Sequence, residues 1–249
     1  LVALCSALLG VSLVLKRYSM IGDGLSHVAF AALTIAVAMN VAPLYISTPI
    51  VTVAAIILLR LSENSKIKGD SAIALISTVS IAIGVVVTAL TKGMNTDVYS
   101  YMFGSILAMS ESDVYMSIAL SVVVIILFVF FYNKIFAVTF DESFAKATGT
   151  RADAYNMIIA VLTAITIVVG MRIMGTMLIS SLIIFPALIS MRNFKTFKSV
   201  IICSAIVSVV CFLLGIILSY LYSIPTGASI VLVNTVALIL SYLIGELRH

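Results

Sequence analysis

The feature that most constrains this chain is a series of long apolar runs with almost no charged residues. A helix that crosses a membrane needs about 20 such residues, because the hydrocarbon layer is roughly 30 Å thick and each residue rises about 1.5 Å. Hydrophobic residues make up 63% of the 249 residues and charged residues only 10%, whereas a soluble domain is about 25% charged. One water-soluble core could not bury so much apolar surface. The sequence therefore predicts an all-α, polytopic membrane protein.

About nine apolar segments are expected as helices, which gives eight or nine membrane spans in a single transmembrane domain over residues 1–249. The first segment opens the chain without a methionine, so we expect that residues preceding Leu1 are missing. The segment 98–109 is apolar but too short to cross, and we expect it to be re-entrant or interfacial on the outer side. The third span could be extended back to Pro43. The expected spans are 1–15, 19–39, 46–61, 71–91, 113–133, 153–170, 173–191, 199–219 and 228–246.

The lysines and arginines predict how the spans are oriented. If the turn at Lys16 and Arg17 is cytoplasmic, alternation of the spans places all 14 basic residues inside except Lys92 and Arg172. The opposite orientation would reverse this distribution, which the positive-inside rule disfavours. The formal net charge of +4 is therefore explained by membrane topology, and no nucleic-acid partner is expected.

The second expected span carries two ionisable residues, Asp23 and His27. They are four residues apart, so their side chains share one face of a helix. A carboxylate and an imidazole are suitable ligands for zinc or manganese, and an ionisable residue inside a span indicates a functional site by default. His27 lies about 15 Å along the helix from Arg17, near the middle of the membrane. The alternative is an internal Asp–His hydrogen bond that only holds helices together, and the spacing alone does not decide.

The largest cytoplasmic segment outside the spans is 134–152, which is too short for an enzyme domain. We expect it to form one short helix that begins near Asp141, is capped by Thr139 or Asp141, and ends at Gly149. This segment either docks a partner or is a solvated loop, and its residues alone favour the loop. The chain also lacks the GxxxxGK[ST] motif, so it has no phosphate-binding loop of its own.

Four hydroxyl residues lie within the spans at places where they could line a pathway. Each could instead bond to a neighbouring helix, which is the more common role of such residues in membranes. They are Ser26 in the second span and Thr176, Ser180 and Ser181 in the seventh.

Three stretches together resemble the permease subunit of the bacterial zinc/manganese/iron ABC importer family. The family pattern S-x-I-G-D-A-L-S-H resembles residues 19–27, although Gly24 stands where alanine is usual. The pattern F-D-x-E-x-A-x-x-x-G is similar to residues 140–149, with the acidic spacing shifted by one. The pattern G-x-x-L-[VI]-S-x-L-[LI]-I-x-P matches residues 175–186. The likeness covers nearly the whole chain in order.

This resemblance implies a subunit of the bacterial cytoplasmic membrane that works as a homodimer with separate ABC ATPase subunits and an extracytoplasmic metal-binding protein. Asp23 and His27 would be the transient metal site, with no permanently bound cofactor. The transported ion would be a divalent metal, with zinc favoured over manganese because residues 101–107 are similar to the zinc-type members. Residues 141–149 would be the coupling helix that sits in a groove of the ATPase. Its coupling residues would be Asp141, Glu142, Phe144, Ala145 and Gly149.

The expected mechanism is ATP-driven alternating access. The external protein delivers the ion to the outer face, where Asp97, Glu111 and Asp113 help to attract it. ATP binding by the partner then moves the coupling helix, and the spans rock between two states. A manganese or iron importer of the same family is the nearest alternative. A proton-coupled secondary transporter should have inverted repeats, which we do not find, and a vitamin or siderophore permease would leave the Asp–His pair unexplained.

Overall fold

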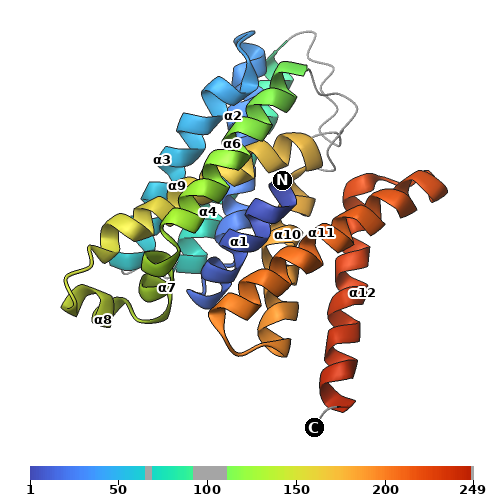
Figure 1. Ribbon diagram of the computed structural model, residues 1–249. Coiled ribbons are helices and arrows are strands. Elements are labelled where there is room, and N and C mark those ends of the chain that lie inside the picture. Colours follow the sequence, from blue (N-terminus) through green and yellow to red (C-terminus); the bar gives the residue numbers. More distant parts are fainter. Residues whose placement is uncertain (65–68, 92–110, 248–249) are drawn as a thin grey trace.

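The structure is a computed structural model that describes residues 1–64, 69–91 and 111–247, and all the regular elements in these ranges are α-helices. They form one bundle of long helices (Figure 1). The helices are α1 (Val2–Leu15), α2 (Ile21–Ala38), α3 (Pro43–Asn64), α4 (Gly69–Leu90), α6 (Glu111–Phe130), α7 (Tyr132–Phe140), α8 (Glu142–Ala147), α9 (Ala152–Met174), α10 (Thr176–Asn193), α11 (Phe197–Tyr222) and α12 (Thr226–Leu247).

The expected membrane spans correspond to the observed helices. Among the described residues, seven helices are long and apolar enough to cross a membrane, and α6 with α7 forms a bent eighth. The first expected segment is the shorter apolar helix α1. The third begins at Pro43, as the possible extension predicted. The prediction of a polytopic all-α fold is confirmed, whereas the segment 98–109 lies outside the described residues.

Two expectations about helix boundaries are wrong. The turn expected near Arg172 is absent, because α9 continues to Met174 and only Gly175 separates it from α10. Gly175 has φ 85° and ψ 167°, a backbone conformation that is open essentially to glycine alone. The segment 134–152 also contains more than one short helix, since α7 occupies its first part and its axis is turned by 69° from that of α6.

The connection from α1 to α2 is a short turn closed by backbone hydrogen bonds. Arg17 has a left-handed conformation with φ 61°. Its N–H donates to the carbonyl oxygen of Val14 at 3.0 Å, and the N–H of Tyr18 donates to that of Leu13 at 2.8 Å. This pair of bonds is a Schellman motif, which satisfies the last carbonyls of a helix and fixes the direction of the chain. Helix α2 therefore leaves α1 at a defined angle.

Helix α1 lies at the centre of the bundle, packed against α9, α10 and α11. Two serines of α11 donate across the interface to backbone carbonyls of α1, Ser204 to Ala7 at 3.3 Å and Ser208 to Ala3 at 2.9 Å. Helices in lipid gain little from apolar contact alone, so close packing at small residues and hydrogen bonds between helices hold them together. The core of the bundle is therefore built around α1.

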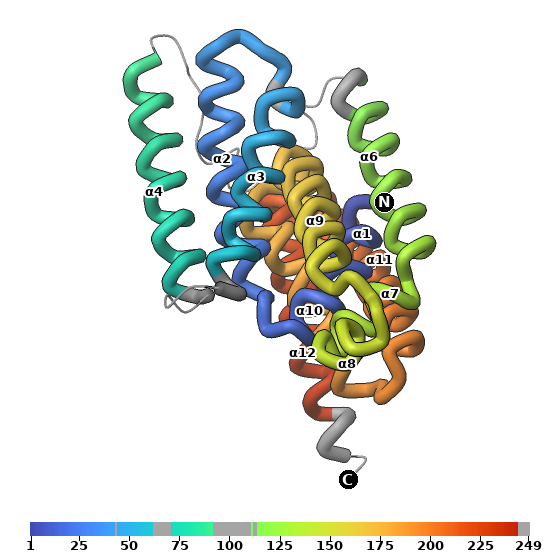
Figure 2. The backbone as a smooth tube through the Cα atoms, turned by 90° about the vertical axis from the view of Figure 1, so that its left-hand side faces the viewer, coloured from blue at the N-terminus to red at the C-terminus, as the bar shows by residue number. Residues whose placement is uncertain are grey.

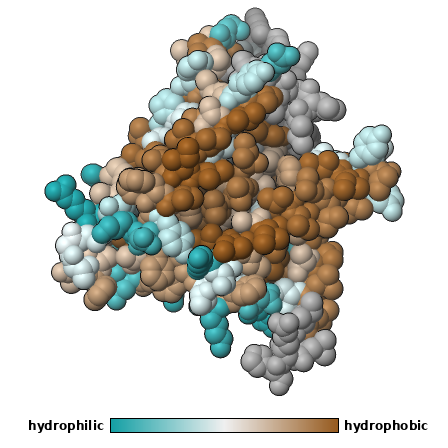
Figure 3. All heavy atoms as spheres, in the orientation of Figure 1, coloured by the Kyte–Doolittle hydropathy of each residue, from teal (hydrophilic) through white to brown (hydrophobic). Residues whose placement is uncertain are grey.

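The outer faces of the bundle suit a lipid environment. Apolar side chains cover the middle of the face in Figure 3, and polar ones gather towards its ends. Helix α8 and the α10–α11 turn lie at one end of the bundle, and the α2–α3 turn lies at the opposite end (Figure 2). This arrangement agrees with the predicted alternation of the spans, and the assignment of the α8 end to the cytoplasm stays a prediction.

Candidate functional site

The structure places Asp23 and His27 side by side in the first turns of α2. The distance from His27 Nε2 to Asp23 Oδ2 is 3.6 Å. The His27 side chain is 22% exposed and that of Asp23 46% exposed, so both remain accessible. The predicted sharing of one helix face is confirmed, and the pair offers one nitrogen ligand and one oxygen ligand to an ion.

Of the four hydroxyl residues predicted to line a pathway, Ser180 is the one brought to this pair. Its hydroxyl on α10 donates to the Thr176 carbonyl at 3.4 Å and lies close to the carboxylate of Asp23. Ser26 is fully buried, and its hydroxyl donates to the backbone carbonyl of Asp23 at 2.7 Å. Thr176 and Ser181 are also buried, and the Ser181 hydroxyl has no hydrogen-bond partner in the described part of the chain. The role of all four in a pathway stays a prediction.

Among the described residues, Asp23 and His27 have no third metal-ligating side chain beside them. Within residues 1–64, 69–91 and 111–247, no group of three or more His, Cys, Asp and Glu side chains is placed to hold a metal ion. Zinc usually binds four ligands. Asp23 and His27 together offer two of the ligands that such an ion takes.

The two glycines beside Asp23 allow neighbouring helices to approach it. A Cβ atom at Gly24 would lie 2.6 Å from Ile73 Cγ2 on α4. A Cβ at Gly22 would lie 3.1 Å from Ile183 Cδ1 on α10. Contacts this short are rare in close-packed interiors. Gly24, where the family pattern has alanine, therefore gives Ile73 of α4 room next to the pair.

The predicted short helix near Asp141 is present as α8. The Asp141 side chain caps it by accepting a hydrogen bond from the Phe144 N–H at 2.8 Å. Gly149 ends it with φ 80°, and its N–H donates to the carbonyl of Lys146 at 3.1 Å. The predicted start, cap and terminating glycine are confirmed. Both ends are therefore stabilised locally, although a helix of this length is not stable alone.

Helix α8 buries one residue and presents another. Ala145 is 1% exposed and packs with Val138 and Ala152 in a small apolar cluster below the helix. Phe144 is 64% exposed. The sequence places an aromatic ring on the outer face of a helix that is fixed to the bundle by its other face, an arrangement suited to a protein interface.

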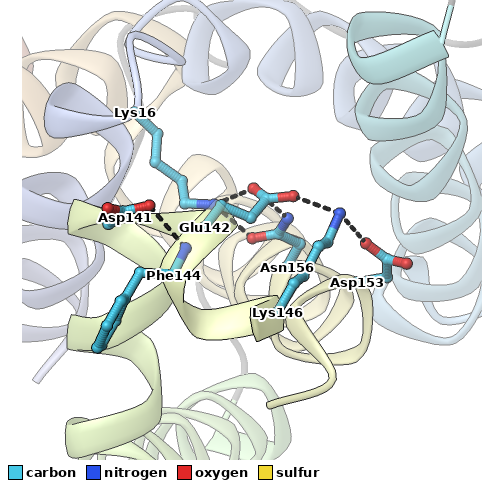
Figure 4. Close-up of polar contacts among 7 residues, drawn as sticks. All are labelled: Lys16, Asp141, Glu142, Phe144, Lys146, Asp153 and Asn156. Carbon is cyan, nitrogen blue, oxygen red and sulfur yellow. Dashed lines mark hydrogen bonds and ion pairs between the residues drawn. The ribbon is translucent and has the colours of Figure 1, made fainter. Parts of the chain in front are cut away.

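A polar network joins α8 to the rest of the bundle (Figure 4). Glu142 Oε2 accepts a hydrogen bond from Asn156 Nδ2 at 3.0 Å and lies 3.4 Å from Lys16 Nζ. Lys16 Nζ also donates to Asn156 Oδ1. Lys146 Nζ lies 3.0 Å from Glu142 Oε1 and 3.0 Å from Asp153 Oδ1. Sequence reasoning missed Lys16 and Asn156, because nothing in their spacing indicates contact with α8.

The charges in this network support one another. Desolvation alone would raise the pKa of Glu142, but hydrogen bonds from Asn156 and Lys146 and the nearby charges of Lys16 and Lys146 outweigh it and lower that pKa. The hydrogen bond to Asp153 and then that to Glu142 raise the pKa of Lys146. Both groups therefore remain ionised at neutral pH.

The model of the family described as "ABC 3 transport family" matches residues 1–245. The chain belongs to the ABC 3 transport family. The resemblance of its three motifs to permeases of bacterial metal-ion ABC importers is thereby confirmed, and its place is the bacterial inner membrane. Its multi-span helical fold is that of an ABC importer permease.

Relatives of this ABC 3 permease carry names that refer to more than one metal. It is 29% identical to the high-affinity zinc uptake system membrane protein ZnuB of Haemophilus influenzae, over 96% of this chain and 92% of that protein. It is 26% identical to the manganese import system permease protein ScaB of Streptococcus gordonii, over 95% of this chain and 84% of that protein. The expected preference for zinc therefore has no support from its relatives.

A solved structure is similar to this ABC 3 permease over almost its full length. The structure is titled "PsaBC from Streptococcus pneumoniae in complex with Fab". It has a TM-score of 0.86 and 27% sequence identity, and the match covers 97% of this chain and 87% of that chain. The bundle observed here is therefore the family fold.

Proposed function

We propose that this permease subunit of a metal-ion ABC importer carries zinc or manganese, with Asp23 and His27 as transient ligands within the membrane. The observation that supports this proposal is their 3.6 Å separation in partly open positions on α2. The chain has two histidines, and His27 is the one that lies in a span. Placing a carboxylate and an imidazole inside a membrane span costs free energy, and such residues are usually kept for a function. Transport of an ion would be that function.

The chemistry of the pair suits an ion that must be released again. A neutral imidazole nitrogen and a carboxylate oxygen bind both zinc and manganese. A site in a conduction path must bind an ion strongly enough to admit it and weakly enough to release it. Two ligands from each chain would bind the ion without holding it as tightly as a full set of protein ligands would. The choice between zinc and manganese then depends on the ligands that complete the shell.

We further propose that a separate ATPase subunit binds α8, and that an external metal-binding protein and a second copy of the chain complete the importer. The chain has no GxxxxGK[ST] sequence with which to bind ATP itself. Phe144 offers an exposed aromatic anchor, while Ala145 fixes α8 to the bundle. These features support α8 as the coupling helix, with Asp141 and Gly149 defining its two ends.

Metal uptake by a His27→Ala variant tests the proposed site. Cells that express the permease with its ATPase and binding protein should lose zinc and manganese uptake, while the variant still reaches the membrane. His249→Ala, which changes the other histidine of the chain, is the matched control and should transport normally. Undiminished uptake of both metals by His27→Ala would show that the pair is not the metal site.

Co-purification with the ATPase tests the proposed coupling helix. Phe144→Glu would place a charge in the interface, at a cost of about 2–5 kcal/mol if it is desolvated. The variant should insert in the membrane but lose its ATPase partner. Phe194→Glu is a control, because Phe194 is also exposed, at 45%, and follows α10. Normal ATPase binding together with normal ATP-driven uptake by Phe144→Glu would mean that α8 is not the coupling helix.

A further inference from the structure

Lys16 is a nearly buried lysine at the end of α1. Its side chain is 9% exposed. Lysine is almost never fully buried unless it is paired. The free energy needed to remove an ammonium group from water exceeds what a single poorly placed partner contributes. Glu142 of α8 and Asn156 of α9 provide the pairing (Figure 4). Lys16 is thus held between the proposed coupling helix and the core of the bundle.

The backbone leads from Lys16 to the metal pair without a loose loop. The Schellman turn binds the Tyr18 N–H to Leu13, and the Ile21 N–H donates to the Tyr18 carbonyl at 3.0 Å. Helix α2 begins at Ile21, and Asp23 is in its first turn. A displacement of Lys16 therefore passes into the start of α2 through a hydrogen-bonded turn.

A small cavity lies beside this path. Its volume is about 20 Å³, and residues that line it include Lys16, Ile21 and Asn156. This is room for about one water molecule. The end of α1, the start of α2 and the side of α9 therefore border one small space.

We propose that Lys16 is a positioning residue that transmits movement of α8 to the first turn of α2 and so to Asp23 and His27. The proposal rests on the proposed function, in which the ATPase moves α8. Glu142 moves with α8, and its contact with Lys16 carries the displacement across to α1 and the turn. The exposed pair of Lys146 and Asp153 differs in that it joins α8 only to α9.

The test uses the complex of permease and ATPase in lipid vesicles, and measures metal ions imported per ATP hydrolysed. Lys16→Met keeps the length of the side chain and removes its charge. It should bind the ATPase and hydrolyse ATP as the wild type does, while the number of ions per ATP falls about fivefold, within the range for residues that modulate coupling. Lys16→Arg, which keeps the charge, should restore the ratio.

Two controls separate transmission from a structural role. Asp153→Asn removes only the exposed Lys146–Asp153 pair that joins α8 to α9 and should leave the ratio unchanged. The double variant Lys16→Met with Glu142→Gln should lose less than the product of the two single losses, because both changes interrupt the Lys16–Glu142 contact. Multiplying losses in the double variant would refute the proposal.

The outcomes also separate this proposal from the proposed function. Failure of the wild-type chain to bind an ATPase and import metal would refute the proposed function and, with it, the role of Lys16. Normal coupling in Lys16→Met would refute only the role of Lys16. Loss of ATPase binding in both Lys16→Met and Lys16→Arg would also refute it, because Lys16 would then be needed for assembly.

Discussion

The packing of α1 against α10 depends on Gly10, and replacing it by alanine should destabilise the protein. A Cβ atom at Gly10 would lie 2.1 Å from the carbonyl oxygen of Ile183 and 2.9 Å from its carbonyl carbon. Van der Waals contact at close packing requires about 1 Å more separation than this. The obstacle is backbone, so no side-chain rotation relieves it. The two helices must move apart.

Two opposing effects set the magnitude. Alanine is favoured over glycine in a helix interior by about 1 kcal/mol. Overpacking a close-packed interface typically costs about 1–3 kcal/mol, and a clash with backbone belongs at or above the upper end of that range. Overpacking therefore wins, and Gly10→Ala should lose about 2 kcal/mol, equivalent to a fall in Tm of about 4–8 °C for a chain of this size.

Thermal unfolding of the purified permease in detergent measures this effect. The chain has no tryptophan, but Cys5 and Cys211 are buried, so a thiol-reactive dye reports their exposure on unfolding. Gly22→Ala is the matched control. Its new Cβ would meet only Ile183 Cδ1, at 3.1 Å, the far end of a flexible side chain, and its Tm should change little. A Gly10→Ala variant that melts at or above the wild-type temperature would refute this account of the packing.

Three further predictions concern α8. Asp141→Ala removes the cap on the Phe144 N–H and should destabilise α8 by about 1 kcal/mol, seen as faster amide exchange; unchanged exchange would contradict the cap. The Cβ atom added by Gly149→Ala would meet no atom within 4 Å. Only the left-handed backbone, with φ 80°, opposes this change, and it should destabilise α8 by about 1 kcal/mol. Gly149→Asn should destabilise it less, because asparagine tolerates this conformation better. Because the pKa of Glu142 is lowered, its charge stabilises the fold above its unfolded-state pKa and this stability is lost as pH falls through the folded pKa. The Tm values of wild type and Glu142→Gln should therefore differ at pH 7 and converge once the pH has fallen below the folded-state pKa of Glu142; a difference that stays constant with pH would contradict this.

Apolar runs predicted the helices well and their boundaries less well. The turn was expected near Arg172 because a charge usually marks the end of a span. An arginine near the end of a span can instead extend its head to the interface, and α9 continues past it to Gly175. The bend between α6 and α7 could not be predicted, because neither proline nor glycine interrupts the apolar residues around Phe131.

The pairing of Asp23 with His27 was predictable because its geometry is local. Residues four apart on a helix share a face whatever surrounds them, and Asp23 and His27 needed no tertiary information. The cap and the end of α8 were predictable for the same reason, since Asp141 and Gly149 act on neighbouring backbone groups. The approach of Ser180 to Asp23 could not be read from spacing, because it depends on how α10 packs against α2.

The network around Glu142 was not predictable, because its members are far apart in the sequence and each already had an explanation. Lys16 satisfied the positive-inside rule, and Asn156 was one polar residue near the start of an apolar span. Only the fold places their side chains against α8. A lysine whose charge only sets the membrane topology can stay in water. The side chain of Lys16 is instead nearly buried, so topology alone does not explain its position.

The position of Lys16 matters because the path from it to Asp23 and His27 is short and hydrogen-bonded. A long flexible loop would absorb a small displacement of α8 before it reached α2. The Schellman turn instead has few free torsions, since Arg17 and Tyr18 both donate back into α1. Helix α12, by contrast, packs mainly on α10 and α11, and within the described part of the chain it has no comparable connection to α8. Movement of α8 should therefore reach the first turn of α2 before it reaches the periphery of the bundle.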